Sequence, residues 1–395
     1  MLNQYYWPGV EATANLLTEL CEALANDYEV TVITGSTRET LPAREVRNGV
    51  TVVRVHSTAY DRSALSRRAA NYFTYVLGAV RESFRQGRPE IVLCMTDPPF
   101  IGSAAELVAR RYRVPLVVSS QDVFPEIAVK LGRLRNPVAI AALRVMIASY
   151  LRYADRVVVI GETMKKRVVE KGVEPRRIRV ISNWGDAETV TPGPRDNPWT
   201  REHGLLDRFV VMHFGNVGHA QDLDTLIRAT TLLRDLDDLA VPIIGVGARL
   251  DQLTALADVL EAESVRFLPW QAYERRAEPL RAAHVHVVGL ARGLAGYIVP
   301  SRLWGVLAAG RPVIAAAEDD SETAQVVRAT GCGVVVPPGD SFRLAEAIRA
   351  FHDGAYDLDE MGRRARDYAE SETDRTIAVG RYRAVLEEVR ADDGR

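Results

Sequence analysis

The chain has 395 residues, of which 47% are hydrophobic and 26% are charged, and its formal net charge is −2. These proportions are typical of globular proteins, and the length predicts two domains. A net charge so close to zero argues against a protein that binds the phosphate backbone of nucleic acids.

The cysteines and the hydropathy pattern bear on the compartment. Cys21, Cys94 and Cys332 lie far apart and fit no disulfide or metal spacing, which predicts a reducing cytoplasm. We expect no membrane-spanning segment, because no run of about 18 apolar residues occurs. The most apolar stretch is Val138–Leu151, which Arg144 interrupts. It is either a helix packed inside the protein or a helix that faces a membrane surface.

The N-terminal half alternates apolar strands with helices. A strand at Met1–Gln4, a helix at Glu11–Leu24 and a strand at Glu29–Thr34 form a βαβ opening. The first strand is shorter than the usual ~5–6 residues, so we expect a few native residues to precede Met1. Further strands are predicted at Val50–His56, Ile91–Met95, Leu116–Ser120, Arg156–Ile160 and Arg179–Ile181. Further helices are predicted at Asn71–Arg85, Ser103–Arg111, Val138–Tyr153 and Glu162–Lys171.

A Pro- and Gly-rich linker at Asn183–Trp199 separates this half from a second, similar series. Its predicted strands are Phe209–Phe214, Val241–Val246, Val265–Leu268, His286–Gly289, Pro312–Ala316 and Gly333–Val336. Its predicted helices are Leu223–Leu233, Ala248–Ala262, Tyr273–Ala283, Pro300–Ala309, Glu322–Thr330 and Phe342–His352. The tail at Leu358–Val389 is also predicted to be helical.

Apolar strands that alternate with helices predict an α/β fold with parallel sheets covered on both faces. We expect two Rossmann-like, doubly wound domains at residues 1–185 and 186–370, followed by a helical tail at 371–395 that packs back on the N-terminal domain. Ligands of such sheets bind at the carboxyl ends of the strands. Two domains that face a cleft can hold a donor on one side and an acceptor on the other.

One stretch of the second half, Gly293–Ala316, has the features of an anion site. A glycine-rich loop leads into a helix opened by Pro300 and Ser301. The free N–H groups and the dipole of a helix N-terminus favour negative charge. Arg302 adds a cation in the first turn. We therefore expect this segment to hold the diphosphate of an activated sugar.

Two other strand ends carry glycines that allow close approach of a ligand. Gly215, Asn216 and Gly218 follow one strand, and Gly247 with Arg249 follows the next. Each is either part of a ligand site or an ordinary tight turn. Asp222 and Asp224 match a metal-binding D-x-D pattern, but we favour Asp222 as a helix N-cap. His219, in the loop after Gly218, is the histidine that could touch a ligand. We expect no metal site.

Two more positions in the second half have two interpretations each. Trp270 gives a flat face for a nucleotide base, or it is a buried Trp near a turn. Glu322 hydrogen-bonds ribose hydroxyls, or it favours the dipole of the helix that it opens.

In the first half, Asp122 and Glu126 follow a strand and enter a loop. Either carboxylate could position an acceptor hydroxyl or act as a base, or one of them caps a helix. Asp97 occupies a similar βα turn with a weaker claim.

With these residues assembled, the chain resembles a retaining glycosyltransferase of family 4, which has the GT-B fold. The resemblance rests on Phe214-Gly215-Asn216-Val217-Gly218-His219-Ala220-Gln221, Val299-Pro300-Ser301-Arg302-Leu303, Leu307-Ala308-Ala309-Gly310-Arg311-Pro312-Val313-Ile314, Gly331-Cys332-Gly333, Pro337-Pro338-Gly339-Asp340 and Met361-Gly362-Arg363-Arg364-Ala365-Arg366. The N-terminal half resembles a subgroup that assembles bacterial surface polysaccharides, through Asn3-Gln4-Tyr5-Tyr6-Trp7-Pro8 and Asp122-Val123-Phe124-Pro125-Glu126.

The chain departs from this family at the donor site. Members usually place an Arg and a Lys after the first strand of the second half, where this chain has Asn216 and Gln221. Many members also carry a pair of Glu residues, where this chain has Tyr297 and Gly305.

The departures imply substitutes for the missing groups. Arg302, supported by Arg249 or Arg292, is our candidate for the cation that holds the diphosphate, and Glu322 is our candidate for the ribose contact.

The resemblance implies a hexosyltransferase that moves a sugar from a nucleotide-sugar, expected to be UDP-linked, to a hydroxyl acceptor with retention. The predicted donor-binding residues are Gly215, Asn216, Gly218, Gln221, Gly247, Arg249, Trp270, Tyr297, Ser301, Arg302 and Glu322, and the predicted catalytic residues are Asp122, Glu126 and Arg302. No cofactor and no metal are expected. The alternatives are a UDP-sugar 2-epimerase of the same fold and a catalytically weak nucleotide-sugar-binding subunit.

The acceptor is expected to be a polysaccharide precursor, for which a lipid-linked form is one interpretation. A soluble small molecule, as in glycosylated secondary metabolites, is the alternative. Arg62, Arg67 and Arg68, next to Asn71–Val76, form a basic and aromatic patch that could contact the cytoplasmic face of a membrane. The same patch could be an ordinary surface loop beside a buried helix.

Overall fold

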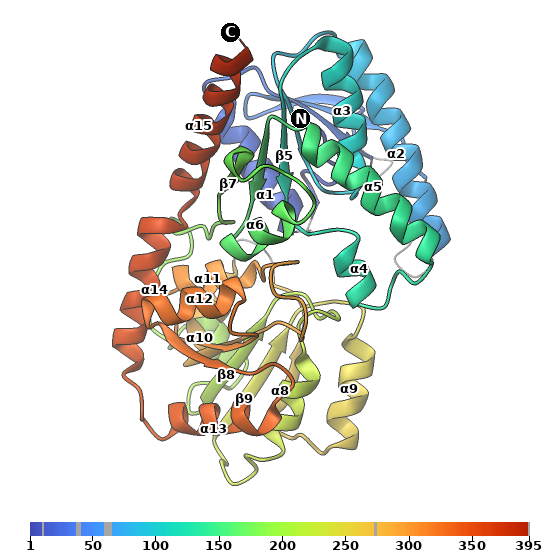
Figure 1. Ribbon diagram of the computed structural model, residues 1–395. Helices are drawn as coiled ribbons and strands as arrows, with labels where there is room; N and C mark the ends of the chain where they lie inside the picture. Colours follow the sequence, from blue (N-terminus) through green and yellow to red (C-terminus); the bar gives the residue numbers. More distant parts are fainter. Residues whose placement is uncertain (10–11, 37–40, 59–64, 272–274, 394–395) are drawn as a thin grey trace. The chain divides into compact units, whose positions relative to one another are not determined.

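The protein, described here as a computed structural model, forms two compact units (Figure 1). The structure describes residues 1–9, 12–36, 41–58, 65–271 and 275–393. The N-terminal unit comprises Met1–Ser182 together with Ala378–Arg395, and the C-terminal unit comprises Asn183–Ile377. Arg62, and the side chains of Arg67 and Arg68 from the predicted basic patch, lie outside the described residues.

The sheet of the N-terminal unit has two groups of strands joined through Leu2. The strands are β1 (Thr31–Gly35), β2 (Arg44–Arg47), β3 (Val50–Val55), β4 (Val92–Met95), β5 (Leu116–Ser120), β6 (Arg156–Val159) and β7 (Ile178–Val180). Their orders are β1-β3-β2 and β4-β5-β6-β7. Leu2 makes parallel bridges to Ile33 in β1 and Cys94 in β4. The predicted first strand is thus reduced to the bridges of Leu2.

Strand β2 was not predicted, although the sequence has a clear hairpin signal. It pairs antiparallel with β3 across Asn48 and Gly49, whose φ angles are 46° and 81°. Two left-handed residues in succession suit a two-residue hairpin loop, for which Asn-Gly is the preferred pair.

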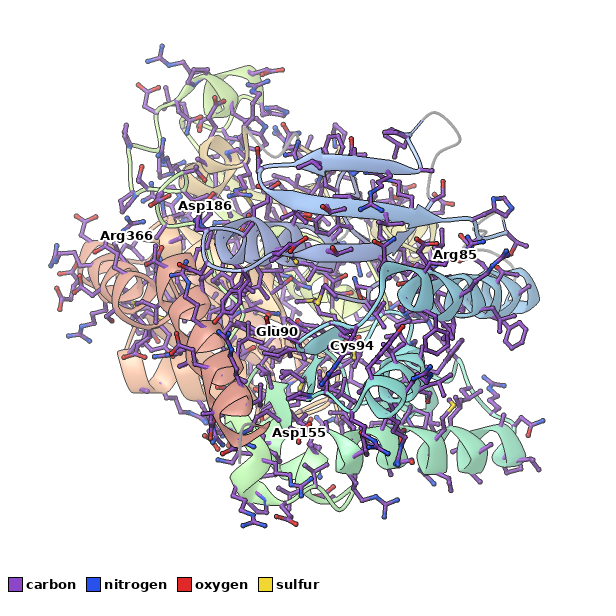
Figure 2. All side chains as sticks on the ribbon, turned by 90° about the horizontal axis from the view of Figure 1, so that it is seen from above. Arg85, Glu90, Cys94, Asp155, Asp186 and Arg366 are labelled. Atoms are coloured by element: carbon purple, nitrogen blue, oxygen red, sulfur yellow. The ribbon has the colours of Figure 1, made fainter. Side chains whose placement is uncertain are left out.

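Helices cover both faces of this sheet. They are α1 (Ala12–Leu24), α2 (Leu65–Gln86), α3 (Ile101–Tyr112), α4 (Glu126–Lys130), α5 (Pro137–Tyr153) and α6 (Glu162–Val169), with a short 3-10 turn at Pro175–Arg177. Helix α3 packs against both α2 and α5, so these three helices form one layer (Figures 1 and 2). Arg85 marks α2 in the view from above in Figure 2.

Helix α5 contains the most apolar stretch of the chain, yet its N-terminal half lies on the surface. Val138 is 76% exposed and Val145 is 69% exposed, whereas Ile147, Tyr150 and Leu151 are buried. The interpretation as an internally packed helix therefore holds only for its C-terminal half. No helix among the described residues is long and apolar enough to cross a bilayer.

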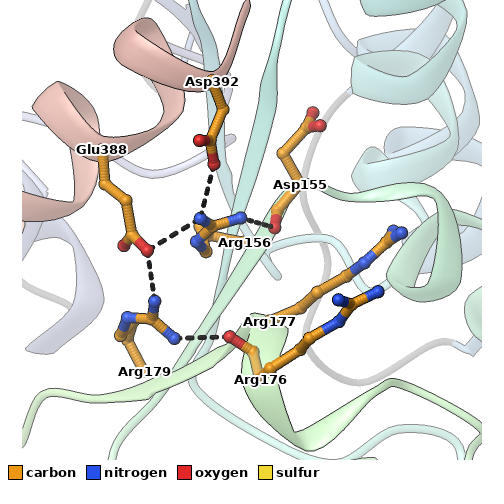
Figure 3. Close-up of a pocket in the computed structure, with 7 residues that line it drawn as sticks. All are labelled: Asp155, Arg156, Arg176, Arg177, Arg179, Glu388 and Asp392. Atoms are coloured by element: carbon orange, nitrogen blue, oxygen red, sulfur yellow. Dashed lines mark hydrogen bonds and ion pairs between the residues drawn. The ribbon is translucent and has the colours of Figure 1, made fainter.

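The C-terminal tail folds as two helices, α14 (Leu358–Glu372) and α15 (Arg375–Asp393). The Tyr382 and Ser119 hydroxyls, on α15 and β5, hydrogen-bond at 2.8 Å. A cavity of about 410 Å³ beside α15 is lined by Asp155, Arg156, Arg176, Arg177, Arg179, Glu388 and Asp392 (Figure 3). There, Arg156 Nη2 donates to Glu388 at 2.7 Å and to Asp392 at 2.8 Å. These contacts confirm that the C-terminal helix packs on the N-terminal unit.

The C-terminal unit contains a second sheet, in which the strand pairs are all parallel. Its strands are β8 (Phe209–Phe214), β9 (Leu239–Ile244), β10 (Val265–Leu268), β11 (Val285–Gly289), β12 (Val313–Ala316) and β13 (Gly333–Val336). Their order is β10-β9-β8-β11-β12-β13. The helices are α7 (Pro198–Glu202), α8 (Leu223–Thr230), α9 (Leu250–Val259), α10 (Ala277–Ala282), α11 (Arg302–Ala308), α12 (Glu322–Thr330), α13 (Ser341–His352) and α14. The predicted pair of Rossmann-like sheets is confirmed.

This strand order locates the ligand edge of the C-terminal sheet. From β8 the chain proceeds to β9 and β10 on one side, and it then returns to β11, which is the neighbour of β8 on the other side. The direction of winding therefore reverses between β8 and β11. Ligands of doubly wound sheets bind at the carboxyl ends of strands at such a reversal.

The segment predicted as a linker belongs to the C-terminal unit and is held by arginines. Arg276 Nη2 donates to Asp186 at 2.7 Å, and Arg281 Nε donates to the Thr191 carbonyl at 2.6 Å. Arg366 donates to the carbonyls of Ala187, Val190 and Ala308. The Pro- and Gly-rich composition of Asn183–Trp199 thus marks an extended segment that hydrogen bonds anchor within the C-terminal unit.

Two helical glycines of the N-terminal unit are expected to respond to alanine in opposite directions. A Cβ at Gly102 in α3 would lie 2.5 Å from the Tyr150 ring, whereas a Cβ at Gly380 in α15 would meet nothing within 4 Å. We expect Gly102→Ala to lower the free energy of unfolding by about 1–3 kcal/mol through overpacking. Gly380→Ala is the control and should raise it by up to about 1 kcal/mol. Urea titrations measure both, and equal stabilisation by both changes would contradict the packing of Tyr150 on α3.

Candidate donor and acceptor sites

The turns after β8 and β9 touch each other through their backbones. Val217 N donates to the Val246 carbonyl at 2.9 Å. A Cβ at Gly245 would lie 1.8 Å from the Gly215 carbonyl oxygen, and one at Gly247 would lie 2.1 Å from that of Val217. Only glycine permits this approach, so the two turns form one continuous edge at the carboxyl ends of the strands.

Arg302 places an unpaired positive charge at this edge. A Cβ at Gly215 would lie 3.3 Å from Arg302 Nε, so the guanidinium crosses the end of β8. Arg302 Nη1 is buried and has no hydrogen-bond partner among the described residues. Burial lowers the pKa of Arg302 to about 10. Burial and the charge of Arg302 keep the pKa of His213 well below its usual range, so His213 is neutral at physiological pH.

The helix behind Arg302 is a weaker anion site than the sequence suggests. Helix α11 begins at Arg302 and has 7 residues. The N–H groups of Leu303 and Trp304 already donate within the first turn, to the carbonyls of Pro300 and Ser301 at 3.2 and 3.3 Å. Ser301 is exposed at the N-cap position and makes no side-chain capping bond. The charge of Arg302, more than the helix dipole, therefore defines this site.

Glu318 occupies the glycine-rich loop that was predicted to be open to an anion. Its Oε2 accepts from Gly293 N at 2.8 Å and from Ala295 N at 3.4 Å. Glu318 was not among the predicted site residues. Its position two residues after β12, at the same sheet edge, is the sequence signal for this role.

Several predicted donor-binding side chains are already engaged. Gln221 is buried, and its Oε1 accepts from Gly218 N at 3.0 Å, so it shapes the turn after β8. Arg249 forms a two-bond ion pair with Asp224, in which Nη2 donates to Oδ1 at 2.8 Å. By contrast, Asn216 is exposed at the turn. Arg249 is thus a partner of Asp224 before any ligand binds.

Arg292, the other supporting cation, is engaged through its side chain, because its Nη2 donates to the Pro338 carbonyl at 3.0 Å. Asp222 holds the N-cap position of α8 in a left-handed conformation, with φ of 53°. Its carboxylate accepts from Gly339 N at 2.8 Å and makes no capping bond. The N-cap position is right, but the carboxylate joins two loops instead. No group of three or more metal-ligating side chains occurs among the described residues.

Trp270 lies at the carboxyl end of β10 with much of its ring accessible. It is 43% exposed, and its ring packs at a tilt on Phe214, with centroids 5.5 Å apart. Val246, at the end of β9, is 51% exposed. The interpretation of Trp270 as a buried residue is therefore wrong, and an exposed aromatic face stands beside the turn after β8.

The remaining predicted donor residues lie on the other side of the winding reversal. Tyr297 closes the glycine-rich loop, where its N–H donates to the Leu294 carbonyl at 3.0 Å. Glu322 is the first residue of α12, after Ser321, whose Oγ caps the helix by accepting from Ala324 N. Gly305 lies within α11, and a Cβ there would meet only Leu280, at 3.7 Å. The chain could thus accommodate a larger residue at Gly305 but has none.

In the N-terminal unit, Asp122 is a carboxylate without a partner. It follows β5, and its carboxyl group accepts no hydrogen bond from the described residues. Asp97 follows β4, the strand next to β5. Burial, and then the charge of Asp97, raise the pKa of Asp122 to about 7. Asp97 and Asp122 thus stand at the ends of neighbouring strands, and Asp97 stays a functional candidate beside Asp122.

Glu126 is in a different state from Asp122. Its carboxylate accepts from Lys171 Nζ at 2.6 Å and from Arg144 Nε at 3.1 Å. Burial alone would raise the pKa of Glu126, but these two partners lower it overall. Glu126 is therefore an ionised residue of an ion-pair network at the start of α4.

Comparison with known proteins gives a consistent picture for both halves. Residues 12–184 match the Glycosyl transferase 4-like domain, and residues 197–370 match Glycosyl transferases group 1. A relative from Pseudomonas aeruginosa, the probable glycosyltransferase WbjE, is 30% identical over 324 residues, which is 82% of this chain and 80% of WbjE. WcaI of Escherichia coli K12, a glycosyl transferase named for colanic acid biosynthesis, is 26% identical over 75% of this chain and 74% of its own.

The fold also has solved counterparts. HepE of Anabaena, in complex with UDP-glucose, superposes with a TM-score of 0.77 at 15% sequence identity, over 98% of each chain. Both the sequence matches and the fold therefore agree over nearly the whole chain. The protein belongs to the glycosyltransferases, with a 4-like domain followed by a group 1 domain in a GT-B fold.

Proposed function

We propose that this glycosyltransferase moves a sugar from a UDP-linked donor to a hydroxyl group, with retention at the anomeric carbon, as a member of family 4. The observation that carries the proposal is the unpaired Arg302 guanidinium at the winding reversal of the C-terminal sheet. A buried cation without a carboxylate is costly, and an anionic ligand is the group that offsets this cost. The diphosphate of a nucleotide-sugar has the required charge.

The other donor-site residues are proposed to contact different parts of the nucleotide-sugar. Trp270 stacks on the base, Glu322 contacts the ribose, and the turns at Gly215, Gly218 and Gly247 let the backbone approach the phosphates. Asn216 and Ser301 add neutral donors, Gln221 and Arg249 support the turns, and Tyr297 borders the sugar. HepE was solved with UDP and with UDP-glucose, which supports a UDP-linked donor here.

The proposed chemistry needs stabilisation of the departing diphosphate more than it needs a base. Arg302 is positioned to balance the charge that develops on the leaving group, so the site requires no metal. The acceptor hydroxyl attacks from the face that the diphosphate leaves, and a phosphate oxygen takes its proton. Asp122 then orients the acceptor, and Glu126 holds the nearby ion-pair network.

The proposed acceptor is a lipid-linked precursor of a surface polysaccharide at the cytoplasmic face of the membrane. The name of WcaI, which refers to colanic acid biosynthesis, supports a polysaccharide precursor. A soluble hydroxyl acceptor is the competing possibility, and the acceptor assay below separates the two.

A screen of nucleotide-sugars by thermal shift and calorimetry tests the donor. A ligand at about 100 times its Kd should stabilise the protein by about 2.7 kcal/mol. The stabilising donor is then incubated with extracts of polyprenyl-linked sugars or with soluble acceptors, and the anomeric configuration of the product is determined by NMR. An inverted product would contradict retention. Epimer formation without an acceptor would identify a 2-epimerase, and binding without any reaction would identify a donor-binding subunit.

Trp270→Ala is expected to weaken binding of the nucleotide by about 1–3 kcal/mol, because a base loses its stacking partner. Calorimetric titration with UDP measures the loss. Trp270→Phe, which keeps a flat ring, is the matched control and should retain most of the affinity. Inorganic pyrophosphate, which has no base, should bind equally to the wild-type protein and Trp270→Ala. An unchanged affinity for UDP would place the base elsewhere.

A further inference from the structure

The outer side of the helix layer of the N-terminal unit collects exposed apolar side chains. Among the described residues of this unit, seven large apolar side chains are exposed, and all but Val46 lie on α2, α3 and α5. We call these six the outer helix face: Phe73 (60% exposed), Leu77 (56%), Phe84 (39%), Leu107 (49%), Val138 (76%) and Val145 (69%). Such side chains gathered on adjoining helices mark an interaction surface.

Helix geometry aligns these residues. Phe73, Leu77 and Phe84 are spaced by four and seven residues and so share one side of α2. Val138 and Val145 are seven residues apart and share one side of α5, which Arg152 extends after another seven.

Helix α3 joins the two stripes, because it packs against α2 and α5 (Figures 1 and 2). On one side, the rings of Phe84 and Tyr112 meet edge to face at 6.1 Å. On the other side, Arg110 of α3 lies over the Tyr153 ring at 4.0 Å. The outer helix face is therefore one surface.

The charged residues around this surface are basic. The exposed basic residues of these helices and of the segment before α5 are Arg81, Arg85, Arg110, Arg111, Lys130, Arg133, Arg135, Arg144 and Arg152. The acidic residues described on α2, α3, α4 and α5 are Glu82, Glu106 and Glu126, and all three are only partly exposed. They pair with Arg85 at 3.6 Å, with Arg110 at 2.8 Å and with Arg144 at 3.1 Å. In a chain whose net charge is −2, this is a local concentration of positive charge.

We propose that the outer helix face docks on a lipid bilayer that contains anionic phospholipids. A bilayer surface takes apolar side chains into its interfacial layer and pairs arginines with its phosphates. A second copy of the chain would set this basic surface against itself, which disfavours a dimer through the same face. The biological purpose rests on the proposed lipid-linked acceptor, but binding to lipid does not depend on that activity.

Vesicle sedimentation of the full chain, without donor or acceptor, tests the proposal. The protein should bind vesicles of phosphatidylcholine mixed with phosphatidylglycerol and should be released by salt, while vesicles of phosphatidylcholine alone should bind it weakly. The double variant Phe73→Ser with Leu77→Ser should lower the partition coefficient about tenfold or more. Arg81→Glu with Arg135→Glu should also lower it and should reduce its dependence on salt.

Matched controls lie on the C-terminal unit. Val259 is 79% exposed and Phe342 is 60% exposed, so Val259→Ser and Phe342→Ser remove similar exposed apolar groups and should leave vesicle binding unchanged. Circular dichroism and thermal melting check that all variants fold, which substitutions at these exposed positions should not disturb.

Three results would overturn the docking proposal. These are no binding of the folded wild-type protein to anionic vesicles, equal losses in the control variants, and self-association of the wild-type protein that the same substitutions abolish. Transfer to a water-soluble acceptor separates this proposal from the proposed function. Transfer without vesicle binding would overturn docking alone, and vesicle binding without transfer would overturn the function alone.

Discussion

Arg302→Ala is expected to lower kcat/KM for the donor by about 10²–10³-fold, because the leaving diphosphate loses its principal charge partner. The guanidinium crosses the end of β8 at Gly215, and no carboxylate among the described residues neutralises it. Gln221 and Arg249 cannot easily substitute, since each is bound within the loops of the same sheet edge. Steady-state kinetics and donor titrations by calorimetry measure the loss.

The stability of Arg302 variants should move in the opposite direction from their activity. Arg302→Met keeps the length of the side chain and removes a buried, uncompensated charge, so it should unfold at equal or higher urea concentration than the wild-type protein. Arg302→Lys should retain part of the activity, as a point charge without the planar fork of the guanidinium.

Arg328→Ala is the control for a general loss of positive charge from the C-terminal unit. Arg328 donates to Asp319 on the surface of that unit and should be dispensable for transfer. If Arg302→Met were both less stable and fully active, then Arg302 would be structural and the diphosphate site would lie elsewhere.

The strand ends of the C-terminal unit were predictable because their signals are local. A strand, a glycine-containing turn and a helix start follow each other within a few residues, as at Phe209–Phe214 and Gly215. The parallel order of the sheet then brings these ends to a single edge. The position of Arg302 in the first turn of a helix is a local signal of the same kind.

The partners of those side chains were not predictable, because they are set by contacts between distant parts of the chain. Glu318 binds Gly293 across 25 positions, and Arg249 binds Asp224 across 25 positions. The exposure of Trp270 depends on its packing against Phe214 from another strand. Local patterns identify which residues stand at a site, and tertiary contacts decide which of them are available to a ligand.

The same distinction between local patterns and tertiary contacts explains where the observed fold differs from the predicted one. The apolar run of α5 predicted a helix correctly, but its hydropathy could not tell an internal helix from one with an exposed apolar side. Leu2 counts as a strand residue only because Ile33 and Cys94 lie on either side of it. Neither the exposed side of α5 nor the pairing of Leu2 can be predicted from neighbouring residues, because both depend on contacts with distant parts of the chain.

Asp122→Asn is expected to lower kcat/KM for the acceptor by about 10²-fold and to remove a pH dependence near neutrality. Burial and Asp97 raise the pKa of Asp122 to about 7, and the ionised carboxylate is a stronger hydrogen-bond acceptor for the hydroxyl than the protonated acid or an asparagine amide. Wild-type kcat/KM should therefore rise with pH to a plateau above about 7, while the asparagine variant should have no rising limb there. Asp97→Asn should shift the limb to lower pH, because it removes one of the two causes of the raised pKa.

The direction in which Asp122→Asn changes the free energy of unfolding follows from the same raised pKa. The folded state holds the Asp122 proton more tightly than the unfolded chain does, where the pKa is about 3.9. The contribution of Asp122 to stability is therefore greatest below about pH 4 and is lost as the pH rises to about 7. The free energy of unfolding of Asp122→Asn should match that of the wild-type protein at acid pH and exceed it by roughly 2–4 kcal/mol above neutrality, in urea titrations across this range.

Glu126→Gln should behave in the opposite way and lose stability above acid pH, because the ionised carboxylate that it removes is paired with Lys171 and Arg144. If the two variants shared one pH profile, the distinction between an unpaired Asp122 and a paired Glu126 would be wrong, and so would the acceptor role given to Asp122.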